Sequence, residues 1–392
     1  MHQEARPLRL TGHLAGLDGV RGLAILMVMA IHFVGDSTPH TTGQRLVVKA
    51  ASFGLLGVDL FFVLSGFLIT GLLLDAKGQP HYFRNFYARR TLRIFPLYYL
   101  VLAVVFLVLP RVMTPPPGLE QVREHQIWLW TYTANFYIAA KSSWNALTYV
   151  NHFWSLAIEE HFYLLWPLIV FSFSRETLER VCVGVVFAGL VLRIGLALGG
   201  ISELSISVLT PCRIDTLCVG ALLALLARRE GGVERLVGRA SRGALALGTV
   251  VFLLSVWCAT TKLGLPVLHQ VRSTLYALFF GALSLTSLQR EGALGRAFRS
   301  GVLRFFGKYS YGIYVYHGIL TWYLLEVRAD DRLDALLGGH SLAIAAKAVL
   351  GVSVSVVVAV ASYQLFERRF LGLKRFFEAP RAAASQVETV RT

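Results

Sequence analysis

Two ionisable residues with complementary chemistry, Arg21 and His32, flank an apolar run near the start of the chain, RGLAILMVMAIH. At about 100° and 1.5 Å per residue, a helix would place them on one face, about 20° out of phase and roughly 16 Å apart along its axis. A guanidinium binds anions, and an imidazole exchanges protons near neutral pH. The spacing therefore predicts an anion-binding group and an acid–base group in one stripe. The alternative interpretation is an arginine that reaches the membrane surface and a hydrogen-bonded core histidine.

Further ionisable and hydroxyl side chains interrupt other apolar segments. They are Asp59 and Ser65 in residues 57–70, Glu159 and Glu160 in 154–167, Arg213 and Asp215 in 213–220, and Tyr311, Tyr316 and His317 in 308–317. A charged side chain that faces lipid costs at least about 2.5 kcal/mol, so such groups usually face the interior of a helix bundle. A structural ion pair or a core hydrogen bond explains each one singly. Their number predicts a polar cavity or conduit inside the bundle.

The segments that must position these residues are long and apolar. The chain has 392 residues, of which 55% are hydrophobic and 16% charged, and its mean hydropathy is +0.58. A helix of about 20 apolar residues crosses a bilayer core of roughly 30 Å, and long apolar runs recur at residues 54–74, 95–112, 181–198, 245–259 and 342–361. The fold class predicted is an all-α polytopic membrane protein surrounded by lipid. The four cysteines have no CxxC or CxxH spacing, so we expect no metal site.

The basic residues predict which connections lie in the cytoplasm. They cluster after apolar spans, at residues 77–93, 228–242, 290–308 and from 368 onward, as the positive-inside rule expects. This distribution argues against a nucleic-acid partner despite a formal net charge of +15. The chain has apolar segments beginning near residues 17, 50, 95, 127, 153, 181, 205, 243, 267, 305 and 341.

All of the basic connections can lie on the cytoplasmic side only if one of these segments does not cross the membrane. Residues 127–140 form a segment of about 14 residues, too short for a span. We predict about ten transmembrane helices, one short re-entrant or interfacial segment at 127–140, and both termini in the cytoplasm. The alternative is that this segment crosses and another does not.

In these features the chain resembles the membrane-bound acyltransferase 3 family, which O-acylates glycans and related molecules. The likeness runs from Leu17 to about Arg369 and rests on ordered blocks: the Arg21/His32 pair, GVDLFFVLSGFLIT at 57–70, RxxR from Arg90 to Arg93, WSLAIEEHFYLLWP at 154–167, RIDTLCVG at 213–220, KYSYGIYVYH at 308–317 and YQLFE ending at Glu367. His161 replaces a common Gln, and Arg368 replaces a common Pro. The resemblance implies the stand-alone type, with an acyltransferase domain over residues 1–370 and a disordered basic tail over 371–392.

The resemblance implies an O-acyltransferase of a bacterial inner membrane. It would move an acyl group, by default acetyl, from cytoplasmic acyl-CoA to a hydroxyl of a glycan, lipid-linked sugar or related acceptor outside, without a tightly bound cofactor. Arg21, Arg90 and Arg93 are expected to bind the phosphates of CoA, because guanidiniums bind phosphate bidentately. His32 is expected to act as general base, with Glu159 or Glu160 orienting its imidazole. The residues expected to bind substrate are Asp59, Ser65, Arg213, Asp215, Tyr311, Tyr316 and His317, and Arg213 or one of the two tyrosines is expected to stabilise the oxyanion.

Two alternatives stay open from the sequence. The acyl group could pass through a covalent intermediate on Ser65 or His32. The chain could instead be a proton-coupled transporter of a small polar solute or lipid-linked glycan, because buried His, Glu and Asp side chains suit a carrier. The spans show no internal two-fold repeat, which argues against the carrier. Turnover of acetyl-CoA by the purified protein separates these two classes.

Overall fold

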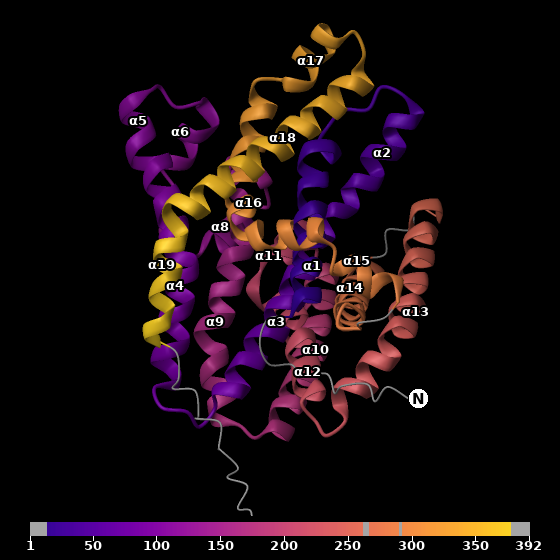
Figure 1. Ribbon diagram of the computed structural model, residues 1–392. Helices are drawn as coiled ribbons and strands as arrows, with labels where there is room; N and C mark the ends of the chain where they lie inside the picture. Colours follow the sequence, from indigo (N-terminus) through magenta and orange to yellow (C-terminus); the bar gives the residue numbers. More distant parts are fainter. Residues whose placement is uncertain (1–13, 262–265, 290–291, 378–392) are drawn as a thin grey trace, which may run out of the picture.

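All regular structure in the described part of the chain is helical (Figure 1). The computed structural model describes residues 14–261, 266–289 and 292–377. Six helical stretches in these ranges are long and apolar enough to cross a membrane: Ala15–Gly35, Thr42–Ala76, Tyr82–Val112, Arg175–Leu198, Gly232–Ser255 and His340–Phe377. The prediction of an all-helical polytopic membrane protein is confirmed, whereas the number of crossings and their direction stay predictions.

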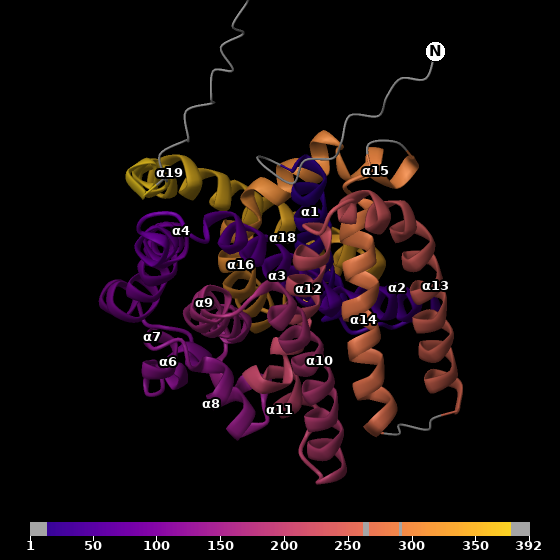
Figure 2. The same cartoon turned by 90° about the horizontal axis from the view of Figure 1, so that it is seen from below.

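The helices vary widely in length, and several of the stretches above contain more than one helix. The longer helices are α1 (Ala15–Ala30), α2 (Thr42–Ser52), α3 (Leu56–Ala76), α4 (Tyr82–Ala103), α9 (Trp154–Ser172), α10 (Arg175–Leu198), α12 (Ile214–Ala227), α13 (Gly232–Thr261), α14 (Pro266–Thr286), α16 (Gly301–Glu326) and α18 (His340–Ser362). The shorter ones are α5 (Leu109–Val112), α6 (Pro117–Arg123), α7 (Ile127–Trp130), α8 (Ala134–Lys141), α11 (Glu203–Val208), α15 (Ala293–Phe298), α17 (Ala329–Leu337) and α19 (Arg368–Gly372). Figures 1 and 2 show α3 and α12 near the middle of the bundle, with α13 and α14 side by side at its edge.

The segment expected not to cross, residues 127–140, is divided into two short helices, α7 and α8. Tyr132 separates them with a left-handed backbone (φ 55°), which an L-residue adopts only when its surroundings stabilise it. Its buried ring stacks on Tyr98 of α4 at a centroid distance of 4.2 Å. Neither helix is long enough to span a bilayer core.

Glycines let the backbones of α1 and α16 touch. A Cβ at Gly22 would lie 1.9 Å from the carbonyl oxygen of Leu303, and a Cβ at Gly307 would lie 1.8 Å from that of Asp18. Only a residue without a side chain fits so close an approach. The contact sets the distance between the helix that carries Arg21 and the helix that carries Tyr311.

Replacing Gly22 by alanine is expected to lower the free energy of unfolding by about 1–3 kcal/mol, because the added methyl group forces two backbones apart. The measurement is the thermal unfolding midpoint of the purified protein in detergent. Gly184→Ala on α10 is the matched control, since nothing lies within 4 Å of a Cβ at that position. Equal midpoints for Gly22→Ala and the wild type would contradict this account of the α1–α16 contact.

The prediction of a disordered tail from residue 371 is wrong for residues 371–377. After α18 the chain continues through a π-helical turn, Tyr363–Glu367, into α19 and then a 3₁₀ segment, Leu373–Phe377. Both α19 and the 3₁₀ segment pack against α4, and Figure 1 shows α19 beside it. The rest of the predicted tail, residues 378–392, lies outside the described residues.

Candidate active site

A cavity of about 90 Å³, lined by both apolar and ionisable side chains, lies between α1, α3, α4, α9 and α16. Six residues that the sequence singled out line it together: Arg21, Ser65, Arg90, Arg93, Glu159 and Tyr311. They come from five separate helices. The structure therefore brings the predicted anion-binding arginines to the same cavity as one predicted catalytic carboxylate and two predicted substrate-binding residues.

The arginines are concentrated on α4. Within the described part of the chain, Arg90 and Arg93 have neither an ion-pair partner nor a hydrogen bond, and Arg90 lies over the Tyr163 ring at 5.7 Å. Arg93 also borders two neighbouring cavities of about 210 and 230 Å³, and Lys374 of the 3₁₀ segment lines both of these. Buried or half-buried guanidiniums without acidic partners are suited to bind an anion that enters from outside.

The two adjacent glutamates of α9 have different surroundings. The Ser65 hydroxyl donates a hydrogen bond to the Glu159 carboxylate, and the Tyr163 hydroxyl donates to Ser65 Oγ at 3.1 Å. Glu160 does not line the cavity, and its Oε1 is buried without a hydrogen-bond partner among the described residues. The structure thus separates two carboxylates that the sequence left as equivalent candidates.

His32 does not line this cavity and is connected to it only through the rings of His317 and Tyr314. Tyr314 lines the cavity, the ring of His317 lies 5.3 Å from the Tyr314 ring, and the ring of His32 lies 4.9 Å from that of His317. Nδ1 of His32 is within 2.8 Å of the Val28 carbonyl oxygen. A donated Nδ1–H in this bond leaves Nε2 as the basic nitrogen. The expected pairing of His32 with Glu159 or Glu160 is not formed among the described residues.

Three predicted substrate-binding residues, Asp59, Arg213 and Asp215, are engaged in ion pairs. Asp59 pairs with Arg213 at 2.6 Å, and Asp215 pairs with Arg193 at 2.5 Å, all four being buried. Arg213 and Asp215 therefore pair with other helices and not with each other. The first ion pair joins α3 to the residue before α12, and the second joins α10 to α12. That any of these residues contacts substrate stays a prediction.

The tyrosines expected to stabilise an oxyanion are also occupied. The Tyr311 hydroxyl donates to the Ile94 carbonyl at 2.6 Å, and the Tyr316 hydroxyl donates to Ser362 at 3.0 Å. Tyr316 does not line the cavity. Neither hydroxyl proton is available to a substrate oxygen in this arrangement.

Several polar residues of the site were not selected from the sequence. Ser155 and Tyr163 line the cavity together with Glu159, and the three positions are four residues apart, which places them on one helix face. That spacing was a readable signal, and it also separates Glu159 from Glu160. Lys374 carried no such signal, because it stands in a stretch that resembles a basic tail.

Comparison with known proteins places the chain among acyl-transferring enzymes. Residues 14–363 match the family model described as an acyltransferase domain. The chain is 28% identical over 343 residues to the peptidoglycan O-acetyltransferase OatA of Listeria monocytogenes, covering 83% of this chain and 52% of that protein. It is 30% identical over 321 residues to the putative peptidoglycan O-acetyltransferase YrhL of Bacillus subtilis, covering 78% and 48%.

A more distant similarity covers more of the chain. A putative O-acetyltransferase of Staphylococcus aureus is 24% identical over 381 residues, which are 91% of this chain and 57% of that protein. The chain thus spans about half the length of the curated relatives it matches. No solved structure matches it.

Proposed function

The chain belongs to the acyltransferase 3 family, and from this membership we propose that it transfers an acyl group from acyl-CoA to a hydroxyl of a cell-envelope glycan or related acceptor. Acetyl is the default acyl group, because the relatives are named O-acetyltransferases. The glycan acceptor is favoured by two relatives whose names specify peptidoglycan. The proposal includes a bacterial cytoplasmic membrane, about ten crossings, a non-crossing segment at 127–140 and both termini inside.

One observation carries the proposal: a cavity with unpaired arginines also holds a hydroxyl–carboxylate set, and the rings of Tyr314 and His317 connect it to His32. Arg90 and Arg93 have no acidic partner among the described residues, as a site for the phosphates of CoA requires. Lys374 adds an amino group, a further hydrogen-bond donor, to the two cavities that Arg93 borders. The proposed donor site therefore comprises α4 and the 3₁₀ segment after α19.

The proposed reaction is a direct acyl transfer. The acceptor hydroxyl attacks the thioester carbonyl, a C–O bond forms, and the C–S bond breaks. Nε2 of His32 takes the hydroxyl proton and returns it to the sulfur of CoA, so that an ester and free CoA are the products. The bond between Nδ1 and the Val28 carbonyl supports this role, because it orients the ring and fixes the tautomer that has a basic Nε2.

A covalent variant is supported by the hydrogen bond from Ser65 to Glu159. In it, Glu159 accepts the Ser65 proton as the Ser65 oxygen attacks the thioester, and the acceptor hydroxyl later takes the acyl group from the serine. Labelled acetyl retained on the purified protein in the absence of acceptor would favour this variant. Loss of the label in Ser65→Ala would assign it to Ser65.

The donor site is tested by acetyl-CoA turnover with the purified chain in detergent. Arg93→Ala is expected to raise the KM for acetyl-CoA by about 10–100-fold with a smaller effect on kcat, since each hydrogen bond to a charged group contributes about 1.5–3 kcal/mol. Arg84→Ala is the matched control, because Arg84 is an exposed arginine of the same helix that does not line the three cavities.

Two results would contradict this assignment. Equal KM values for Arg93→Ala and Arg84→Ala would place the donor elsewhere. A wild-type protein that is folded but neither hydrolyses acetyl-CoA nor transfers its acetyl group would favour the carrier and contradict the enzyme.

A further inference from the structure

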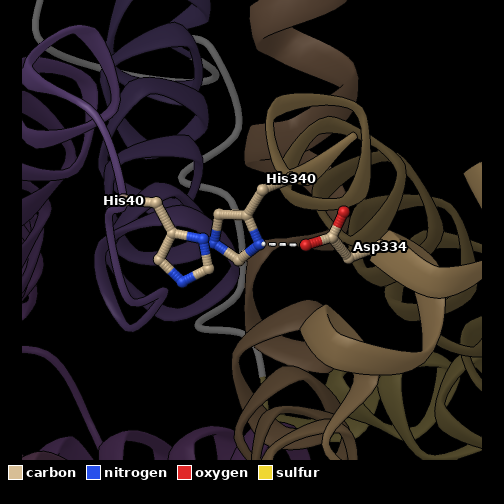
Figure 3. A group of neighbouring side chains, drawn as sticks. All are labelled: His40, Asp334 and His340. Carbon is tan, nitrogen blue, oxygen red and sulfur yellow. Dashed lines mark hydrogen bonds and ion pairs between the residues drawn. The ribbon is translucent and has the colours of Figure 1, made fainter. Parts of the chain in front are cut away.

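Two histidines and an aspartate meet at the end of the molecule opposite the connection between α3 and α4. His40 lies in the loop before α2, Asp334 lies on α17, and His340 is the first residue of α18. Figure 3 shows the His340 ring between the His40 ring and the Asp334 carboxylate. None of them lines the active-site cavity or its two neighbours.

The donor atoms have the spacing of a metal site. One donor atom from each residue lies within 4.8 Å of the other two. Nδ1 of His340 lies 3.2 Å from Oδ2 of Asp334. In tetrahedral Zn²⁺ coordination with bonds of about 2.0–2.1 Å, neighbouring ligand atoms lie about 3.3 Å apart. The His340–Asp334 pair therefore already has the separation of two zinc ligands.

Nε2 of His340 has a hydrogen-bond partner of the kind found in metal-binding histidines. Nε2 lies 2.7 Å from the carbonyl oxygen of Thr38. An Nε2–H donated to this carbonyl leaves the lone pair of Nδ1 facing the Asp334 carboxylate. Metal-ligating histidines almost always donate their other N–H to a carbonyl or carboxylate. A positive charge between these two atoms satisfies both of them: either a proton on Nδ1, or a metal ion, for which a donor atom of His40 also lies within reach.

His40 completes the set after a rotation of its ring. The His40 and His340 rings are stacked, with centroids 3.7 Å apart and 13° between their planes. A metal lies in the plane of the imidazole that binds it, so both rings cannot bind one ion while they are parallel. The His40 side chain is exposed, and only its backbone N–H is fixed, by donation to Gln44 Oε1 at 2.7 Å. The ring can therefore turn without moving the loop.

The two segments that carry the ligands are already joined. The Gln44 side chain donates to Ser341 at 2.9 Å, and Lys347 donates to Ser37 and to Asp330, each at 2.7 Å. The Ser37 bond joins the loop before α2 to α18, the Gln44 bond joins α2 to α18, and the Asp330 bond joins α17 to α18. Ligands on preformed segments lose little conformational entropy when an ion binds.

We propose that His40, Asp334 and His340 bind one Zn²⁺ ion, with water at the open coordination position. The ion links the loop that follows the π-helical turn carrying His32 to the connection between α17 and α18. It stabilises this end of the bundle and takes no part in acyl transfer. Two imidazoles and one carboxylate are a ligand set that zinc commonly accepts.

The test is isothermal titration of the full chain in detergent with Zn²⁺ alone, after chelator treatment and with a purification tag that contains no histidine. One Zn²⁺ per chain is expected, and the ion should raise the thermal unfolding midpoint. His40→Ala and Asp334→Ala should each weaken binding by at least about 10-fold. His340→Gln should do the same, while its amide can still donate to Thr38.

The control is His81→Asn, an exposed histidine with a left-handed backbone (φ 57°) that asparagine tolerates. It should bind zinc as the wild type does. The thermal midpoint of each variant without metal shows whether it folds. A folded wild type that binds no zinc, or a folded His40→Ala that binds zinc as tightly as the wild type, would overturn the proposal.

Discussion

Replacement of His32 by alanine is expected to lower the rate of acyl transfer by about 10²–10⁴-fold, the usual contribution of a general base. The His32 side chain is half-buried, and its ring is oriented by the Val28 carbonyl. The proposed donor site lies on other helices, so the affinity for acetyl-CoA should stay close to the wild-type value. The measurement is the initial rate at saturating acetyl-CoA, together with donor binding by calorimetry.

His125→Ala is the control for this prediction, since His125 contacts Tyr137 and does not line the three cavities. It should leave both the rate and the donor affinity unchanged. A folded His32→Ala protein with the wild-type rate would remove His32 from the mechanism. Equal losses of rate and of donor affinity would assign His32 to binding and not to proton transfer.

Replacement of Asp215 by alanine is expected to destabilise the protein by about 3–5 kcal/mol, because it leaves the buried guanidinium of Arg193 without its counter-charge. The exposed fractions of the two side chains are 3% for Arg193 and 2% for Asp215. Arg193 also donates to the Cys212 carbonyl at 2.8 Å and to Thr274 at 2.6 Å, and these bonds replace only part of the lost pairing. The measurement is the unfolding midpoint in detergent.

A double variant distinguishes a structural ion pair from a substrate-binding carboxylate. Replacing both partners with apolar residues, Arg193→Met with Asp215→Leu, should recover much of the lost stability, since no unpaired charge remains. Glu120→Ala is the matched control, because its ion pair with Arg123 is exposed and should contribute only about 0–1 kcal/mol. A stable Asp215→Ala that has lost only activity would contradict the structural role.

The helical fold could be predicted because apolar length is a strong signal. Runs of bilayer length predicted the class of fold, and residues 127–140 were recognised as too short to span. The sequence did not predict the π-helical turn, Ile31–Gly35, at the start of which His32 lies. A wider turn changes the rotation per residue, so the regular α-helical period does not continue through this turn.

Six residues of the cavity were selected from the sequence, but which side chains lie side by side could be predicted only where neighbours in the sequence are neighbours in space. Arg90 and Arg93 are one turn apart and line one cavity. The partner of Asp59 lies on a segment 154 residues away, and that of Asp215 is 22 residues away. Such pairings depend on helix packing, which hydropathy does not specify. Lys374 likewise lies near Arg93 only because the 3₁₀ segment after α19 packs against α4.

The acyl content of cell-envelope glycans tests the central claim most directly. Glycans would be isolated from a strain that lacks the gene and carries the wild-type chain, His32→Ala or no copy, with equal expression of both proteins. The account predicts base-labile acetate on the glycans with the wild type and a background level with His32→Ala. Glycans that are identical in all three strains, or acetylated equally by His32→Ala and the wild type, would contradict it.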